Sequence, residues 1–260
     1  MSQPEALLRI DGLSVHFGGL VAISDMTFDV HEGEIVSLIG PNGAGKTTAF
    51  NAITGYLQPN SGQSLYRGHS LNGLKPNQIA DLGVVRTFQK TSVFAGNTVF
   101  ENVLIGLHRR GSQSLAGALL RLPEMRAEER QLHEAATELL VFIGLDKRQD
   151  EFASALPYGE QRLLEVAVGL AAQPRLLLLD EPASGMNPSE TQDFVNMVAR
   201  IRARDVTILL VEHDMRVVMG VSDRVVVLNQ GKIIAQGAPA VIQRDPEVIR
   251  AYLGTGASHA

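Results

Sequence analysis

The sequence predicts an α/β fold built around a largely parallel β-sheet. Apolar runs of strand length alternate with helix-length amphipathic segments in the first part of the chain and again after Gly159. In addition, a glycine-rich loop joins the apolar run at 35–39 to a helix-compatible segment at 47–54, which Gly55 ends. Strands separated by helices pair in parallel and are covered on both faces, so we expect a buried central sheet.

The elements are expected in the following order. Strands are predicted at residues 8–17, 27–30, 35–39, 63–67, 84–88, 176–179, 207–211, 224–228 and 232–235. Helices are predicted at residues 47–54, 160–172, 189–202 and 215–221. Between 97 and 150 helical periodicity dominates, with one apolar face made by Val99, Val103 and Leu107 and another by Leu132, Leu139, Leu140 and Ile143. This stretch is the candidate inserted helical subdomain.

Composition excludes several classes of protein. The net charge of −5 argues against a nucleic-acid binder, which would carry a basic face. The lack of cysteine excludes disulfides and thiolate metal sites. The first nine residues contain no long apolar run, and no run in the chain approaches the roughly 18 residues of a membrane span. We therefore expect no signal peptide or membrane span, and any membrane role must depend on a partner.

The glycine-rich loop has a complete G-x-x-x-x-G-K-[ST] pattern. Backbone N–H groups in such a loop, together with the positive end of the following helix, bind a nucleotide's phosphates. Lys46 is expected to reach the β and γ phosphates, and the Thr47 hydroxyl to complete a Mg²⁺ shell. The alternative is an ordinary glycine-rich turn, but the order of strand, loop and helix favours the nucleotide site. The residues assigned to this site are Gly40, Pro41, Asn42, Gly43, Ala44, Gly45, Lys46, Thr47 and Thr48.

A second motif follows the apolar run at 176–179, where Asp180 and Glu181 stand next to each other. The carboxyl ends of strands are where open α/β sheets place their ligands. Asp180 is expected to hold Mg²⁺ directly or through water, opposite Thr47. Glu181 is expected to face the γ phosphate and to polarise the attacking water. Taken alone, the two carboxylates could also be a solvated cap or a helix N-cap.

Four further segments, in order, resemble motifs of the nucleotide-binding subunits of ABC transporters. Gln89 matches the family's Q-loop and His213 its switch histidine. The signature sequence is matched by Leu156-Pro157-Tyr158-Gly159-Glu160-Gln161-Arg162, and the D-loop by Ser184-Gly185-Met186-Asn187. The resemblance implies the P-loop NTPase fold of ABC ATPases, with an antiparallel β subdomain and an inserted α-helical subdomain beside the core. It also implies ATP and Mg²⁺ as the cofactors.

Some segments resemble one subfamily of these ATPases in particular. This subfamily is the LivG-type ATPases of branched-chain amino-acid importers, and the similarity runs from about residue 8 to residue 254. The segments are Arg86-Thr87-Phe88-Gln89, Leu156-Pro157-Tyr158-Gly159, Gly185-Met186-Asn187-Pro188, Glu212-His213-Asp214-Met215 and Ala251-Tyr252-Leu253-Gly254. This resemblance implies an ATP-hydrolysing subunit that dimerises around two ATP molecules and drives import of branched-chain amino acids or related small solutes.

The same resemblance implies the organisation and surroundings of the chain. One ABC domain is expected at 1–254, with the core and β subdomain at 1–89 and 160–254, the helical subdomain at 90–159, and a flexible tail at 255–260. Expected partners are an identical or homologous ATPase subunit in a head-to-tail dimer, two membrane-spanning permease subunits and, indirectly, an extracytoplasmic solute-binding protein, with no nucleic acid. The expected location is the cytoplasmic face of the inner membrane, or the bacterial cytoplasm when the subunit is free.

In the family the signature helix is presented to the nucleotide of the opposite subunit, and a helix N-terminus is an anion site. This role is expected for Tyr158, Gly159 and Glu160, with Ser184 and Asn187 in the D-loop. The chain departs from the usual pattern in three places. Pro157 cannot make the hydrogen bond that the hydroxyl of the usual signature serine donates. Glu160 adds negative charge near a phosphate, and Asn187 stands where many family members have an aspartate in the D-loop. The alternative for this segment is a capped helix without a ligand.

Three single residues carry both a functional and a structural interpretation. Phe17 matches the aromatic position that stacks on adenine, or it is a core residue at a strand end. Gln89 contacts Mg²⁺ or the attacking water, or it is a solvated polar residue. His213 donates to the γ phosphate and orients the water with Glu181, or it is an ion-paired surface residue.

The segment 90–107 follows Gln89 and is expected to link nucleotide state to a membrane subunit. The leucines at 115, 119, 120 and 122 lie near arginines at 109, 110 and 121. They either pack inside the helical subdomain or form an amphipathic surface that adsorbs to a membrane. Packing is favoured, because the segment is short and the protein as a whole is acidic. Two other functions stay open from the residues: a soluble nucleotide-switched ABC module and an exporter ATPase.

Overall fold

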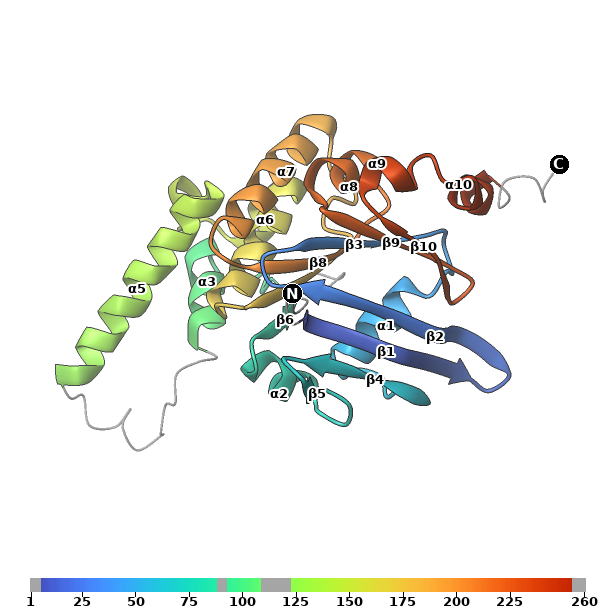
Figure 1. Cartoon of the computed structure of the whole chain (residues 1–260). Helices are drawn as coiled ribbons and strands as arrows, with labels where there is room; N and C mark the ends of the chain where they lie inside the picture. The colour runs from blue at the N-terminus through green and yellow to red at the C-terminus, as the bar shows by residue number, and fades with distance from the viewer. Residues whose placement is uncertain (1–5, 88–92, 109–122, 254–260) are drawn as a thin grey trace, which may run out of the picture.

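The computed structural model describes residues 6–87, 93–108 and 123–253, and Figure 1 shows its two sheets and the helices around them. Within these residues the central sheet has six strands in the order β10-β9-β3-β8-β7-β6. All neighbours pair in parallel except β10, which is antiparallel to β9. The strands are β3 (Ile35–Ile39), β6 (Val84–Arg86), β7 (Leu176–Asp180), β8 (Thr207–Val211), β9 (Arg224–Asn229) and β10 (Lys232–Gly237). The predicted α/β fold with a largely parallel sheet is confirmed.

The central strands are buried because both faces of the sheet are covered. Every residue of β3, β7 and β8 is buried. In β7, Leu177 and Leu179 face the cluster formed with the helices, whereas Leu176 and Leu178 face the cluster formed with the second sheet. This alternation explains why a run of four leucines forms a strand that has no polar face.

The second sheet is antiparallel and has the order β2-β1-β4-β5. Its strands are β1 (Ala6–Phe17), β2 (Leu20–His31), β4 (Ser61–Tyr66) and β5 (His69–Ser70). It packs on α1 (Lys46–Ile53), whose Phe50 and Ile53 are fully buried in the same cluster. Sequence analysis predicted only residues 27–30 of β2. The strand is longer because it pairs with β1 from the turn at Gly18 onward.

The helical part consists of α3 (Val99–His108), α5 (Pro123–Ile143) and α6 (Tyr158–Ala171), with short 3-10 turns η1 (Asp146–Arg148) and η2 (Ala153–Ala155). Figure 1 shows α5 extending away from the central sheet. The predicted faces are confirmed, since Val99, Val103, Leu107, Leu140 and Ile143 are buried, and Leu132 and Leu139 are partly buried against the same cluster. The leucines predicted at 115–122 and the tail at 255–260 lie outside the described residues.

The remaining helices are α2 (Pro76–Asp81), α7 (Pro188–Arg202), α8 (Met215–Val221), α9 (Pro239–Ile242) and α10 (Pro246–Leu253). Helix α10 was not predicted. The carboxylate of Asp245 caps it by accepting the N–H groups of Glu247 and Val248. Val248 is buried in one apolar cluster with Ile39 at the end of β3, so α10 packs close to the glycine-rich loop.

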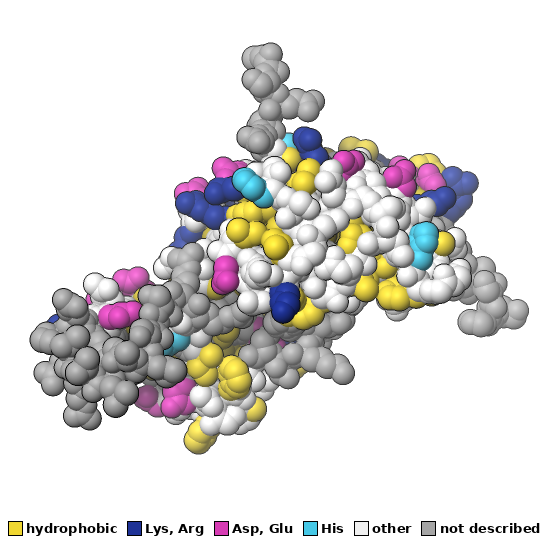
Figure 2. All heavy atoms as spheres, turned by 90° about the horizontal axis from the view of Figure 1, so that it is seen from below, with side chains coloured by type: hydrophobic (Ala, Val, Ile, Leu, Met, Phe, Trp, Pro, Cys, Tyr) yellow, Lys and Arg dark blue, Asp and Glu magenta, His cyan; other side chains and the backbone are white. Residues whose placement is uncertain are grey.

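No helix in the described part of the chain is long and apolar enough to cross a membrane. Figure 2 shows the molecule from below, where basic and acidic side chains are interspersed on the described surface.

Candidate functional site

The glycine-rich loop connects β3 to α1 and is held in place by other elements. Gly45 precedes α1 at φ 108°, and a Cβ there would lie 2.6 Å from the carbonyl oxygen of Ala22, so only glycine fits this conformation and approach. The Gly231 N–H donates to the Ala44 carbonyl at 2.9 Å, and the Ser24 N–H donates to the Gly231 carbonyl at 2.8 Å. The loop is therefore fixed between β2 and the β9–β10 turn before any ligand binds.

Lys46 is buried at the first position of α1, with only 7% of its surface exposed. Its Nζ donates to the carbonyl of Gly40 at 2.7 Å and to that of Pro41 at 3.0 Å. Burial lowers the pKa of Lys46, while the nearby carboxylates of Glu181 and Asp180 oppose that shift. These contacts hold the ammonium over the loop, where a phosphate would be bound.

A pocket of about 580 Å³ joins the loop to the residues predicted around it. Phe17 lines this pocket and is 50% exposed, so the alternative that placed it in the core is wrong. Leu20, Val21 and Gln230 also line the pocket and were missed by sequence analysis. The first two follow Phe17 in the same hairpin, which was the available signal. The predicted residues in the lining are Phe17, Asn42, Gly43, Ala44, Gly45, Lys46, Thr47, Thr48 and Glu181.

Asp180 ends β7 with its side chain fully buried. One carboxylate oxygen, Oδ2, accepts a hydrogen bond from the Arg86 Nη2 at 2.6 Å. The other, Oδ1, is buried and has no hydrogen-bond partner within the described structure. Arg86 was recognised only as part of a family resemblance, three residues before Gln89, and not as a site residue.

The residues present fit Mg²⁺. A hard cation takes oxygen ligands, and an unpartnered buried carboxylate oxygen such as Asp180 Oδ1 is stabilised by one. No cluster of three or more His, Asp or Glu side chains suited to a metal occurs in the part of the chain that is described. In general, Mg²⁺ uses few protein ligands and shares its shell with phosphates and water.

Glu181 follows Asp180 in a left-handed backbone conformation with φ 47°, which is unusual for a residue with a side chain. Its N–H donates to the Val211 carbonyl at 2.9 Å, and its own carbonyl accepts the Ser184 N–H at 3.2 Å. Strained backbone of this kind persists where the surrounding structure fixes it. In this conformation Glu181 lines the pocket together with Lys46 and Thr47.

Glu212, at the end of β8, is a second residue that sequence analysis treated only as a neighbour of His213. Its carboxylate is fully buried and accepts the N–H groups of Ala183 at 3.0 Å, His213 at 2.6 Å and Asp214 at 3.1 Å. It therefore connects the segment after Glu181 to the backbone of His213. The imidazole of His213 is half-exposed, with Nδ1 3.5 Å from Glu212 Oε2.

The signature segment and the D-loop contact each other within the chain. A Cβ at Gly159 would lie 2.8 Å from the Glu190 carboxylate at the start of α7. The Asn187 side chain caps α7, accepting the N–H groups of Ser189 at 2.9 Å and Glu190 at 3.0 Å. Asparagine is a good N-cap, which gives Asn187 a role that needs no negative charge.

Tyr158 and Glu160 both have partners in their own chain. The Tyr158 hydroxyl accepts from Arg162 Nη2 at 2.6 Å, and its ring lies beside Gly185 of the D-loop. Glu160 is paired with Arg148, with Oε2 and Nε 3.1 Å apart. The negative charge that Glu160 adds to the signature is therefore partly balanced. Gln89 lies outside the described residues.

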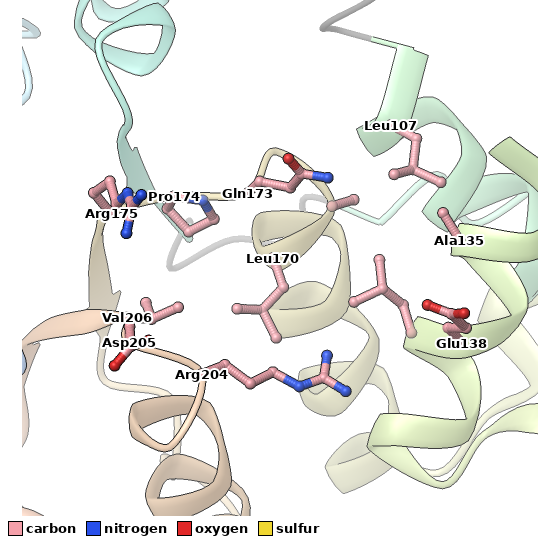
Figure 3. Close-up of a pocket in the computed structure, with 12 residues that line it drawn as sticks. Leu107, Ala135, Glu138, Leu170, Gln173, Pro174, Arg175, Arg204, Asp205 and Val206 are labelled. Atoms are coloured by element: carbon pink, nitrogen blue, oxygen red, sulfur yellow. The ribbon is translucent and has the colours of Figure 1, made fainter. Parts of the chain in front are cut away.

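Another pocket, of about 500 Å³, lies between α3, α5 and α6 and the beginnings of β7 and β8 (Figure 3). Arg175 and Val206, which line it, come directly before these strands. Asp180 and Glu212 stand at the opposite, carboxyl ends of the same strands. This second pocket is therefore separate from the phosphate loop.

A phosphate loop before a helix, an acid pair at the end of β7, which β8 separates from β3 in the sheet, and a pocket lined by the loop and Glu181 define a P-loop nucleotide-binding protein. Comparison with known families identifies its type. The family profile described as ABC transporter matches residues 23–184, and the profile described as branched-chain amino acid ATP-binding cassette transporter matches residues 232–258. The chain belongs to the ABC transporter family.

Individual relatives agree with this assignment. The high-affinity branched-chain amino acid transport ATP-binding protein LivG of Escherichia coli strain K12 is 48% identical over 98% of this chain and 99% of its own length. The corresponding protein BraF of Pseudomonas aeruginosa is 44% identical over the same shares. The ADP conformation of MJ1267, an ATP-binding cassette of an ABC transporter, superposes with a TM-score of 0.84 at 31% identity, covering 96% of this chain and 99% of that one. The resemblance inferred from the motifs is confirmed.

Proposed function

We propose that this chain is the ATP-binding and ATP-hydrolysing subunit of an importer for branched-chain amino acids or related small solutes. The observation that carries the proposal is the pocket in which the phosphate loop, Thr47 and Glu181 meet an exposed Phe17. The near full-length similarity to LivG and BraF supports the importer over the exporter and over a soluble nucleotide switch.

ATP binds along this pocket. Phe17, with Leu20 and Val21 beside it, offers an apolar wall for the adenine ring. The loop N–H groups and Lys46 bind the phosphates, while Thr47 and Asp180 hold Mg²⁺, with Gln89 completing its surroundings. Mg²⁺, when bound, neutralises charge on the phosphates.

Hydrolysis needs a general base for the attacking water and a hydrogen-bond donor near the γ phosphate. Glu181 accepts a proton from the attacking water, because it lines the pocket together with the phosphate loop. His213 donates to the γ phosphate and keeps the water in line, since Glu212 fixes its backbone while leaving the imidazole half-exposed.

The remaining partners complete the transporter. Gly159 at the start of α6, with Tyr158, Glu160, Ser184 and Asn187 around it, closes on the ATP of an identical or homologous subunit in a head-to-tail dimer. The helical subdomain at 90–159, set between core segments 1–89 and 160–254, contacts a permease subunit at the cytoplasmic face of the membrane, and the transporter contains two such subunits. Among the described residues of this subdomain, Phe94, Val141 and Phe152 are apolar side chains that are more than half exposed. A solute-binding protein acts indirectly.

Copurification with the permease subunits and transport in proteoliposomes test this function. We expect ATP-dependent uptake of labelled leucine or a related solute, with the ligand of the soluble receptor identified by mass spectrometry. Stable isolation of an ATPase that binds no membrane subunit would favour the soluble switch. Movement of solute outward would favour the exporter.

Lys46→Ala is expected to weaken ATP binding by about 10- to 100-fold, the effect of losing charge-assisted hydrogen bonds. The backbone cradle remains in the variant, because it depends on Gly45 and its neighbours. Isothermal titration calorimetry measures the change, with Lys75→Ala, outside the pocket, as the control. Unchanged nucleotide affinity in Lys46→Ala would remove this role from the lysine.

A further inference from the structure

Arg86 ends β6 and connects three elements through one buried guanidinium. Its Nη1 donates to Asn51 Oδ1 at 2.7 Å and lies 3.3 Å from Thr54 Oγ1, and both residues belong to the α1 region that follows the phosphate loop. Its Nη2 donates to Asp180 Oδ2 at 2.6 Å. The Arg86 side chain is 8% exposed and that of Asp180 is not exposed at all.

We propose that Arg86 is a positioning residue that sets the Asp180 carboxylate for Mg²⁺ and links that carboxylate to α1. The inference rests on the proposed ATPase function and adds a residue to it. Because Arg86 occupies Oδ2, the carboxylate cannot rotate freely, and the buried, unpartnered Oδ1 is the oxygen left for the ion. A fixed ligand loses less entropy on binding a cation that demands near-ideal geometry.

The shape of the side chain explains why arginine suits this position. A planar guanidinium presents several donors in a fixed fork, so one group bonds to Asn51 and Asp180 at once. The rings of Phe50 and Tyr56 lie 5.5 and 5.9 Å from the guanidinium carbon and restrict it further. A lysine would keep the positive charge but could not span both partners in the same way.

Arg86 also lies close to Asp180 through the pairing of their strands. Arg86 pairs with Leu178 in the β6–β7 ladder, two residues before Asp180 on the neighbouring strand. It also precedes Gln89 by three residues in the sequence. Strand β6 is therefore bonded to β7 through its backbone and to the Asp180 carboxylate through the Arg86 side chain.

Arg86→Lys tests the proposal against Arg67→Lys as a matched control, because Arg67 forms an exposed pair with Glu32 at a similar distance. Binding of a fluorescent ATP analogue is measured first in EDTA and then during a Mg²⁺ titration. Electron paramagnetic resonance of Mn²⁺ with the protein and nucleotide reports the metal directly. We expect Arg86→Lys to raise the half-saturating Mg²⁺ and Mn²⁺ concentrations about tenfold, the range for a disturbed outer-shell contact, and to leave binding in EDTA unchanged.

Asn51→Ala provides a second variant that retains Arg86 and the charge pair, and it should shift the metal titration in the same direction by a smaller factor. Wild-type metal dependence in Arg86→Lys would overturn the proposal. So would equal losses of nucleotide affinity with and without metal, because they would indicate a purely structural role. Failure of the wild-type protein to bind the ATP analogue would instead contradict the proposed function.

Discussion

Glu181→Gln is expected to retain ATP and to lower turnover by roughly 10² to 10⁴-fold, the usual contribution of a general base. The amide is nearly isosteric with the carboxylate, so the shape of the pocket at the end of β7 is preserved. It cannot accept a proton from water at neutral pH. Because φ at Glu181 is 47° and its N–H is bonded to Val211, the backbone should direct either side chain the same way.

Single-turnover hydrolysis and nucleotide binding, measured on the same preparation, separate these effects. Glu32→Gln is a suitable control, since Glu32 is an exposed carboxylate with an arginine partner outside the pocket. Rapid turnover in Glu181→Gln would exclude Glu181 as the general base, and His213 would then be the next residue to test for that role. Loss of ATP binding would mean that the carboxylate positions the loop, for instance by acting on Lys46.

The central sheet was predictable because its signals are local. β8 and α8 have the predicted bounds, since a continuous apolar run and a compact amphipathic segment determine them without distant partners. The first half of β2 was missed because its residues become a strand by pairing with β1. Helix α10 could have been predicted, because Asp245 and Pro246 are a favourable N-cap and first helical residue.

The candidate site likewise has residues that the sequence could predict and residues that it could not. The phosphate loop and the acid pair are short sequence motifs whose chemistry determines their spacing, so sequence alone finds them. Arg86 and Asp180 are 94 positions apart, and Glu212 and Ala183 are 29 apart. Contacts at such separations depend on strand order, which one sequence does not specify. The pairing of Arg148 in η1 with Glu160 in α6 was missed for a different reason, because it depends on how the turn packs against the start of the helix. This pairing concerns the charge that had been expected to disfavour phosphate.

ATP-dependent dimerisation tests the whole architecture. If Gly159 and α6 complete the site of the opposite subunit, Mg-ATP should convert Glu181→Gln from monomer to dimer. Mg-ADP should not, because the γ phosphate that α6 would contact is missing. Adding Gly159→Asp is expected to abolish the dimer while leaving ATP binding by the monomer intact, since a carboxylate would crowd and repel the incoming phosphate.

The structure shows why a second variant is needed. A Cβ at Gly159 already approaches Glu190 in the same chain, so Gly159→Asp could disturb the start of α7 instead of the interface. Arg148→Glu leaves this backbone intact and places a second negative charge beside Glu160. We expect it to weaken the ATP dimer about tenfold or more, because like charges near a phosphate oppose its binding.

Arg202→Glu is the matched control for Arg148→Glu, since Arg202 forms a comparably exposed pair with Asp223 at 2.9 Å. Light scattering and nucleotide binding on the same samples, together with thermal unfolding, distinguish a lost interface from a damaged fold. A dimer that persists in both Gly159→Asp and Arg148→Glu, or that forms equally well with ADP, contradicts the composite site. A dimer lost in both variants but retained in Arg202→Glu requires that the phosphate bound by one subunit meets the signature helix of the other.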